Sequence, residues 1–297
     1  MKSKLFFVSV VGAFTMFFAC GGDLAHVPAW GAAPIKCVGH RGDYPDAPEG
    51  SRPAYANSVA RGSDILKLDL QETKDGVPVL SHDPSLKRTM GWDKMIRKAT
   101  YEEILQHEFK SVGGHEHEKI VTVKEGLVYG SQIPEIWLDF KYFQTNFCEN
   151  VLALVKAAGI SEDRVMCATY TRPALQYMQD KHPNIRRVSH VTLYQTNGVF
   201  NASFGAKGCK DLENDMVREI LAYRDRLGLY GVNIIAHPAM TPTFVQRLKE
   251  AGLWYSLALV HSAKAATKYA PLKPDCVVTR DVRVIRPIFD AVRSTSK

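Results

Sequence analysis

The clearest pattern along the chain is a strict alternation of apolar and ionic residues at positions 65–71. Leucines occupy every second position there, and Lys67, Asp69 and Gln71 occupy the positions between them. Successive side chains of a β-strand point to opposite faces. The run therefore predicts a strand with one apolar face and one ionic face.

Residues 136–141 repeat this alternation, with Asp139 and Lys141 on the polar face. One explanation is a pair of edge strands whose polar faces meet water, as is common in antiparallel sheets. The other is a buried ionic face, in which every unpaired charge would cost several kcal/mol. A fold that lines its interior with charges from two strands is expected to use them.

Strand and helix signals alternate along the rest of the chain. Apolar runs predict eight strands, at residues 36–39, 65–71, 135–139, 165–168, 186–190, 231–235, 254–260 and 275–278. Helical patterns lie between them, at residues 51–61, 147–158, 172–180, 211–227, 241–250, 262–269 and 282–292, and Thr100 with Glu103 matches a capping box. Eight strands alternating with helices predict an α/β fold, a single-domain (β/α)8 TIM barrel, in which functional residues lie at the carboxyl ends of strands.

The first 33 residues are interpreted apart from this barrel domain, which we assign to residues 34–297. Lys2 and Lys4 precede a charge-free apolar run at residues 5–19, which is short for a membrane span and typical of an export signal. Cleavage near Ala33 and lipoprotein processing at Cys20 both fit the sequence. We expect an exported protein that is periplasmic, secreted or lipid-anchored, with an N-terminal lipid at the membrane surface in the last case.

Composition narrows the class of partner. The formal net charge of +7 falls to +6 without residues 1–33, because these hold two lysines and one aspartate. A modest positive surplus suits an anionic small molecule or a phospholipid surface. No basic block with interleaved aromatic residues is present, so nucleic acid is not an expected partner. The six cysteines are widely scattered and show neither a metal-knuckle nor a disulfide-scaffold spacing.

Six short motifs follow one another within about fifty residues. They are His40-Arg41-Gly42, Pro48-Glu49, Lys67-Leu68-Asp69, Thr73-Lys74-Asp75-Gly76, His82-Asp83 and Leu86-Lys87-Arg88-Thr89. This string resembles the signature region of the glycerophosphodiester phosphodiesterase (GDPD) family, part of the superfamily of phospholipase C-like phosphodiesterase barrels. The resemblance implies a TIM-barrel phosphoric diester hydrolase whose substrate is a small-molecule glycerophosphodiester.

Hydrolysis of such a substrate to an alcohol and a phosphomonoester needs one group that accepts a proton and one that donates a proton. Histidine is the side chain best suited to this exchange near neutral pH, and His40 and His82 are the predicted catalytic pair. Arg41, Lys141 and Lys67 are the predicted phosphate-binding residues, because a planar guanidinium and ammonium groups match phosphate oxygens. Two alternatives are a sphingomyelinase D-like lyase that forms a cyclic phosphate and a non-catalytic barrel that binds a phosphodiester headgroup.

Lys67 departs from the family pattern. The family has a glutamate there, and with the following aspartate and a third acid it holds a divalent cation. One alternative is therefore that Asp69, Asp139 and Glu49 hold Ca²⁺ or Mg²⁺ with waters, since hard cations prefer oxygen ligands. A second is that the Lys67 ammonium replaces the metal, as an arginine does in the similar bacterial phosphatidylinositol-specific phospholipases C. A third is that Lys67 abolishes catalysis.

Other histidines are first interpreted as structural or solvated. His115 and His117 alternate with two glutamates after a diglycine, and such a loop is expected to be solvated. His190 and His237 lie near predicted strand ends, and we expect each to be a hydrogen-bonded structural histidine.

Overall fold

The computed structural model describes residues 34–294, so the export signal predicted for residues 1–33, with Cys20, lies outside the described residues. Eight parallel strands form a barrel, because β1 pairs with both β12 and β2 and closes the ring. In barrel order they are β1 (Lys36–Gly39), β2 (Ile65–Glu72), β5 (Glu135–Phe140), β6 (Val165–Thr169), β7 (Arg186–Val191), β10 (Gly231–Ile235), β11 (Trp254–Ala258) and β12 (Cys276–Thr279).

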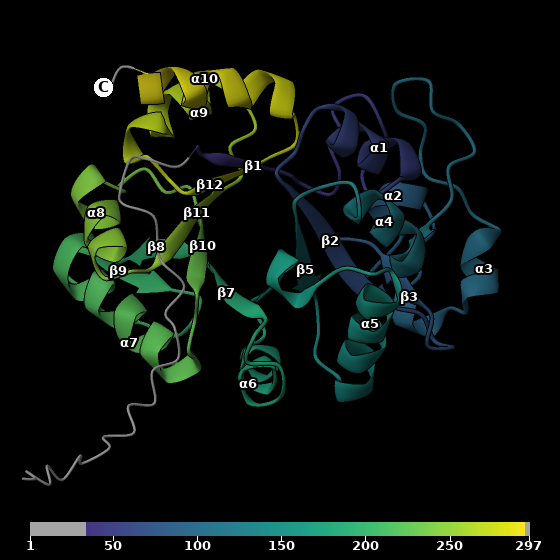
Figure 1. The fold of residues 1–297 in the computed structure, drawn as a ribbon, viewed down its shortest axis with the longest axis horizontal. Helices are drawn as coiled ribbons and strands as arrows, with labels where there is room; N and C mark the ends of the chain where they lie inside the picture. Colours follow the sequence, from purple (N-terminus) through teal and green to yellow (C-terminus); the bar gives the residue numbers. More distant parts are fainter. Residues whose placement is uncertain (1–33, 295–297) are drawn as a thin grey trace, which may run out of the picture.

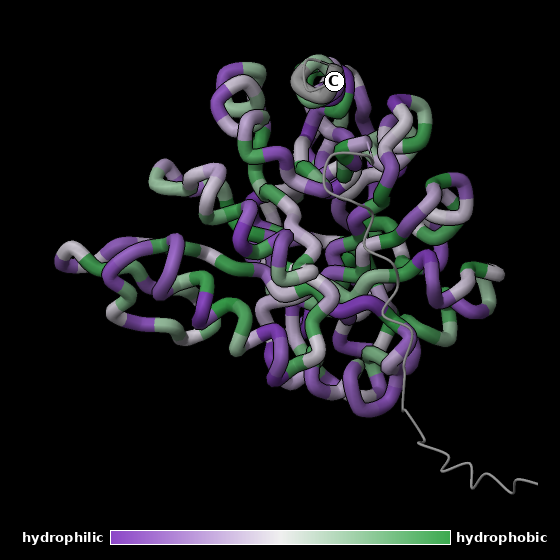
Figure 2. The backbone as a smooth tube through the Cα atoms, turned by 60° about the vertical axis from the view of Figure 1, so that its left-hand side comes forward, coloured by the Kyte–Doolittle hydropathy of each residue, from purple (hydrophilic) through white to green (hydrophobic). Residues whose placement is uncertain are grey.

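Helices surround this ring of strands (Figure 1). They are α1 (Arg52–Ala60), α2 (Lys87–Met90), α3 (Tyr101–Leu105), α4 (Val123–Gly130), α5 (Thr145–Ala157), α6 (Arg172–Lys181), α7 (Val217–Leu227), α8 (Pro242–Glu250), α9 (Ala263–Tyr269) and α10 (Val282–Ser294). Hydrophobic and hydrophilic residues alternate along the outer coils in Figure 2, as amphipathic helices require. The predicted (β/α)8 barrel is therefore confirmed.

Each of the eight predicted strands is present, with ends that differ by at most two residues. The sequence pattern did not predict two pairs of short strands. β3 (Pro78–Leu80) and β4 (Val121–Thr122) extend the sheet beside β2 in antiparallel fashion, and β8 (Leu193–Thr196) pairs with β9 (Val199–Ala202) in a hairpin after β7. Strands of two to four residues are too short to show a period of two, which is why the sequence does not reveal them.

Both faces of β2 are buried, so the explanation of the alternating pattern as an exposed edge is wrong. β2 pairs with β1 on one side and with β5 on the other. Its leucines belong to the hydrophobic layer shared with α4 and α5, whereas Lys67 and Asp69 lie on the opposite face and are 3% and 2% exposed. The ionic face therefore lines the barrel interior.

Side-chain caps explain where several helices begin. Thr100 accepts the Glu103 N–H and Glu103 accepts the Thr100 N–H, which confirms the predicted capping box of α3. Thr122 and Glu125 make the same reciprocal pair at α4. None of the described helices has both the length and the apolar character that a membrane crossing demands.

Candidate active site

The loop after β1 holds His40 and Arg41 in a tight backbone turn. The His40 N–H donates to the Thr279 carbonyl of β12 at 2.7 Å. Arg41 and Gly42 adopt the left-handed region, with φ of 56° and 79°, and a Cβ at Gly42 would lie 2.7 Å from the backbone of Ala54 in α1. Only glycine allows this approach. A left-handed arginine costs about 1–2 kcal/mol, a strain often found where a side chain has a functional direction.

His40 and His82 lie close together at the carboxyl end of the barrel. The Ser81 N–H donates to the Asp69 carbonyl at 2.9 Å, which ties the loop carrying His82 to β2. The two imidazole centroids are 6.0 Å apart and the rings are nearly perpendicular, at 87°. His82 Nδ1 lies 2.8 Å from Asp83 Oδ1, so its Nε2 is the nitrogen that can face a substrate. Their roles in proton transfer stay predictions.

Burial makes both imidazoles weaker bases than a histidine in water. It lowers the pKa of His40 well below its ordinary value, and the positive charge of Lys67 acts in the same direction. Burial also lowers the pKa of His82, although the Asp69 carboxylate opposes that shift. Both rings are consequently neutral at neutral pH and can accept a proton.

Lys67, Lys141, Asp69 and Asp139 form a buried group of four charges, here called the ion cluster. The parallel register of β2 and β5 places Asp69 directly beside Asp139. Lys67 Nζ hydrogen-bonds to Asp69 Oδ1 and lies 2.6 Å from Asp139 Oδ2. Lys141 Nζ lies 2.7 Å from the same Asp69 oxygen and 2.8 Å from the same Asp139 oxygen. Each lysine thus bridges both acids.

Interactions within the ion cluster favour the charged forms of Asp69, Asp139 and Lys141. Burial alone would raise the pKa of Asp69, but the ammonium groups of Lys141 and Lys67 outweigh it and hold the pKa below the ordinary value. The same balance places the pKa of Asp139 well below its ordinary value. Burial opposes the charge of Lys141, yet the two carboxylates raise the pKa of Lys141. Two positive and two negative charges therefore sum to zero.

His190 extends the ion cluster towards β7 and β10. Its Nε2 lies 3.1 Å from Asp139 Oδ2, and its Nδ1 lies 2.9 Å from the amide nitrogen of Asn233. Both residues are buried. Sequence patterns do not link His190 to Asp139, because the two lie on β7 and β5 with β6 between them and meet only in the interior of the closed barrel.

His261 was not considered in the sequence analysis, although it lies beside the predicted catalytic pair. It follows β11, and its ring stacks on that of His40 with centroids 5.3 Å apart and planes at 18°. Its Nδ1 accepts the Arg280 N–H at 3.3 Å. Burial, with the nearby Arg280 and Arg41, lowers the pKa of His261 to about 4. Its place just past a strand end was the signal that could have identified it.

Glu49 pairs with guanidinium groups and is not part of the ion cluster. Its two carboxylate oxygens accept hydrogen bonds from Arg41 at 3.0 Å each. Arg88 donates to the same two oxygens, at 2.6 and 2.8 Å, and reaches Asp83 through its Nε at 2.6 Å. Glu49 therefore orients Arg41 and connects it, through Arg88 and Asp83, to His82.

A small cavity of about 10 Å³ lies between Arg41, Asp69 and His82, room for roughly one water molecule. An open groove of about 400 Å³ adjoins it, and Glu49, Thr89 and Phe109 line both. The groove has an apolar side formed by residues such as Pro45 and Val112, and a cationic rim formed by Arg88, Lys110 and Arg280. The cavity alone is too small for a phosphate group, so a substrate would lie in the groove with its phosphate where the groove meets the cavity.

The residues do not fit the divalent cation that the resemblance implies. The ammonium groups of Lys67 and Lys141 already share Asp69 Oδ1 and Asp139 Oδ2, and two guanidinium groups hold Glu49. Within residues 34–294, His, Cys, Asp and Glu side chains nowhere gather in a group of three that could share a metal ion. The ligand set Asp69, Asp139 and Glu49 is therefore not assembled, and His115 and His117 form no metal site either.

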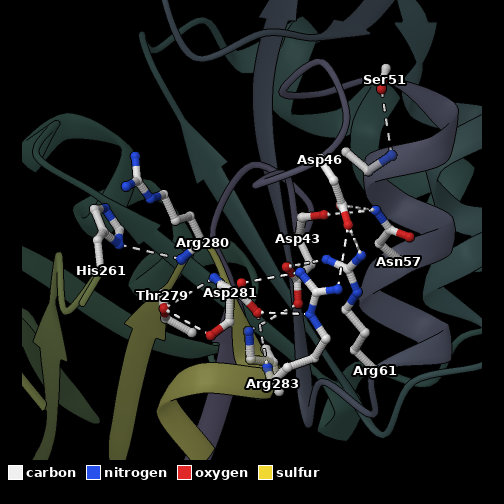
Figure 3. Close-up of polar contacts among 12 residues, drawn as sticks. Asp43, Asp46, Ser51, Asn57, Arg61, His261, Thr279, Arg280, Asp281 and Arg283 are labelled. Carbon is white, nitrogen blue, oxygen red and sulfur yellow. Dashed lines mark hydrogen bonds and ion pairs between the residues drawn. The ribbon is translucent and has the colours of Figure 1, made fainter. Parts of the chain in front are cut away.

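A charged network fastens the β1–α1 loop to the start of α10 (Figure 3). Asp43 is fully buried, accepts Arg61 Nη1 at 2.9 Å and accepts the Val282 N–H at 3.0 Å. Arg61 also donates to Asp46 at 2.7 and 2.8 Å, and Arg283 joins Asp46 at 3.4 Å. The network joins the first and last βα units, so it holds the His40 loop in place.

Comparisons with known proteins point to one family. The model of the glycerophosphoryl diester phosphodiesterase family matches residues 40–284. Mouse lysophospholipase D GDPD3 is 36% identical over 108 residues, which cover 35% of this chain and 33% of that protein, so the chain matches only a third of this relative's length. The protein YqiK of Bacillus subtilis strain 168 is 26% identical over 232 residues, which cover 73% of this chain and 91% of YqiK.

The barrel is also similar to a solved phosphodiesterase from Oleispira antarctica, determined in complex with the product sn-glycerol-3-phosphate. The TM-score is 0.70 at 20% identity, and the alignment covers 87% of this chain and 97% of that one. At this identity the likeness shows the fold.

Proposed function

The chain belongs to the glycerophosphoryl diester phosphodiesterase family, a family of phosphoric diester hydrolases, and from that premise we propose that it hydrolyses a glycerophosphodiester to an alcohol and a phosphomonoester. His40 and His82 divide the two proton transfers. The observation that carries this proposal is the 6.0 Å separation of their rings, with His82 lining a cavity beside Arg41 and Asp69.

The proton transfers need no group beyond the two imidazoles. A water oxygen forms a bond to phosphorus while the bond from phosphorus to the alcohol oxygen breaks. One imidazole accepts the proton of the attacking water, and the other donates a proton to the departing alkoxide. Since both rings are neutral at neutral pH, the donor must first bind a proton, and the negative phosphodiester beside it favours that protonation.

Arg41 and Lys141 are the proposed phosphate ligands. The Glu49 carboxylate fixes the Arg41 guanidinium, and Arg41 lines the cavity next to His82. Lys141 is 18% exposed, the most accessible side chain of the ion cluster. The planar guanidinium of Arg41 and the ammonium of Lys141 can together donate hydrogen bonds to the oxygens of a bound phosphate.

The substrate alcohol is proposed to occupy the groove beside Tyr44 and Arg280. The groove is large enough for a small polar group with apolar carbons, and its rim is cationic. The Oleispira neighbour was solved with sn-glycerol-3-phosphate, which supports a glycerol phosphate moiety in the substrate proposed for this chain.

Phosphorus NMR of the purified protein incubated with sn-glycero-3-phosphocholine tests the proposal. Conversion of the diester resonance to that of sn-glycerol 3-phosphate, lost in His40→Ala, is the expected result. Accumulation of a cyclic phosphate would favour the lyase alternative. Unchanged diester together with saturable binding would favour the headgroup-binding barrel and overturn hydrolysis.

Export is a further part of the proposal. A charged start followed by an apolar run at residues 5–19 supports secretion or lipid anchoring at Cys20. The intact mass of the protein recovered from its native cells tests this, because signal removal shortens the chain and lipidation adds mass. Recovery of the full 297-residue chain in the cytosol would contradict export.

A further inference from the structure

We infer that Lys67 does the work of a divalent cation and of the glutamate that would hold it, so that this site binds phosphodiester and turns it over without a metal. The inference rests on the proposed function, because Asp69 of the ion cluster lines the same cavity as Arg41 and His82. It follows from the disagreement between the donor set that the family resemblance implies and the contacts observed in the ion cluster.

The net charge of the site is conserved by this exchange. A divalent cation with one glutamate carries a net charge of +1, which is also the charge of a lysine ammonium. The other charged members of the ion cluster are Asp69, Asp139 and Lys141, and the first two match the aspartate and the third acid of the implied pattern. A single substitution can therefore remove the need for a metal and leave the charge that faces the phosphate unaltered.

The Lys67 ammonium also occupies the position that a metal would need. It contacts Asp69 Oδ1 and Asp139 Oδ2, the two oxygens that face each other across β2 and β5. A divalent cation bound to those oxygens would lie within a few ångströms of an ammonium group, and like charges at that separation repel strongly in a buried site. Calcium would in addition require about six to eight oxygen ligands.

Each ammonium keeps one donor for a ligand. An ammonium has three N–H donors, and among the described residues Lys67 and Lys141 each use two of them on Asp69 and Asp139. Asp69 Oδ2 is buried and has no hydrogen-bond partner among the same residues. The ion cluster therefore presents two unshared donors and one unshared acceptor, which suit phosphate oxygens and a hydroxyl.

Lys67 acts on the His40 imidazole as well as on the ligand. After burial, its charge is the largest influence that lowers the pKa of His40, the ring that lies 6.0 Å from the ring of His82. A metal would exert the same influence at that position. Stability alone does not account for the ion cluster, because apolar residues of similar volume can often replace a buried ion pair without loss of stability.

The test compares metal binding and turnover in the wild type with Lys67→Glu, Lys67→Met and the control Lys87→Glu. Lys87 is 68% exposed and pairs with Asp93, so the control introduces the same charge change away from the site. Each protein is dialysed against chelator and titrated with CaCl₂ and MgCl₂ by calorimetry. Turnover of sn-glycero-3-phosphocholine is then measured with and without chelator.

Wild type and Lys87→Glu are expected to bind no cation at this site and to keep full turnover in chelator. Lys67→Glu is expected to bind one cation per chain, to gain thermal stability with Ca²⁺ or Mg²⁺, and to turn over substrate only with the cation. Lys67→Met should lose at least about 100-fold in turnover, with no rescue by either cation.

Three results would overturn the inference. They are stoichiometric cation binding by the wild type that Asp69→Asn abolishes, full turnover in Lys67→Met, and a folded Lys67→Glu that binds no cation. If Lys67→Glu fails to fold, the cation titration of the wild type and the turnover of Lys67→Met still test the inference. Absence of turnover in every protein would refute hydrolysis, whereas the calorimetric comparison would still test the exchange of metal for lysine.

Discussion

The ring of His261 stacks on the ring of His40, with centroids 5.3 Å apart and planes at 18°. The loop after β1 supplies one histidine and the loop after β11 supplies the other, so the contact passes over the end of β12, which lies between those two strands. His40 is 5% exposed, and the stacked ring covers one of its faces. Burial, which dominates the pKa shift of His40, therefore depends partly on His261.

The first prediction concerns the pH dependence of the wild type. A catalytic base must be neutral, and burial lowers the pKa of His40 well below 6.5 and also lowers that of His82. The acid limb of log kcat/KM against pH is therefore expected below pH 6.5. A limb at or above pH 6.5 would show that neither buried imidazole is the base.

The lowered pKa of His40 also makes the free energy of unfolding depend on pH. An unfolded histidine binds a proton near pH 6.5, whereas folded His40 stays neutral at that pH. The contribution of His40 to the free energy of unfolding is therefore fully present above pH 6.5 and is lost as the pH falls towards the lowered folded value. Urea denaturation at several values between pH 7.5 and 5 gives the free energy of unfolding of the wild type and of His40→Phe. The wild-type value minus the His40→Phe value should decrease as the pH falls.

The second prediction tests whether the aromatic ring of His261, stacked on His40, sets the basicity of His40. His261→Ala is expected to admit water to His40 and move the acid limb of kcat/KM up towards pH 6.5. His261→Phe keeps an aromatic ring over His40 and should leave the limb near its wild-type position. Equal profiles for wild type and His261→Ala would show that the stacked ring does not set the basicity of His40.

The third prediction concerns the catalytic pair itself. His40→Ala and His82→Ala should each lower kcat by about 10²–10⁴-fold, the usual contribution of a general acid or base. His182→Ala is the matched control, because His182 pairs with Glu149 beyond α6 and should retain wild-type kcat. Circular dichroism confirms folding, and a His82→Ala variant with undiminished kcat would remove His82 from the mechanism.

The fourth prediction concerns the network drawn in Figure 3. Asp43→Ala removes the buried partner of Arg61 and the acceptor of the Val282 N–H, and should lower the free energy of unfolding by about 3 kcal/mol. Asp93→Ala breaks an ion pair whose side chains are about 70% exposed, and should cost less than about 1 kcal/mol. Chemical denaturation measures both, and similar costs would contradict the assigned role of Asp43.

The fifth prediction concerns the groove. Arg280→Ala removes a cation from its rim and should raise KM for a glycerophosphodiester with an anionic alcohol by about 2–5-fold, the effect of one partly exposed ion pair. Turnover at saturation should change little, because Arg280 lies beside the cavity and not in it. Lys264→Ala, on the exposed part of α9, is the control and should leave KM unchanged.

The sequence alone determined the barrel and the identity of most residues that meet in the site. Hydrophobic alternation along β2 and β5 fixes which side chains enter the interior, since the period of a strand is two. The strand-end rule then places His40, Asp69 and Lys141 at one mouth. These inferences are local, because they depend only on neighbouring positions along the chain.

Only the tertiary structure determines which side chains contact one another. Barrel closure and the register of β2 against β5 place Asp69 beside Asp139, and the ion cluster with His190 follows from that register. The contacts of Glu49 with Arg88 and of His261 with His40 join loops that lie far apart in the chain. The identity of each side chain and the period of each strand can be read from a short segment of the sequence. Which charges pair depends on distances in space, and only the folded chain sets those distances.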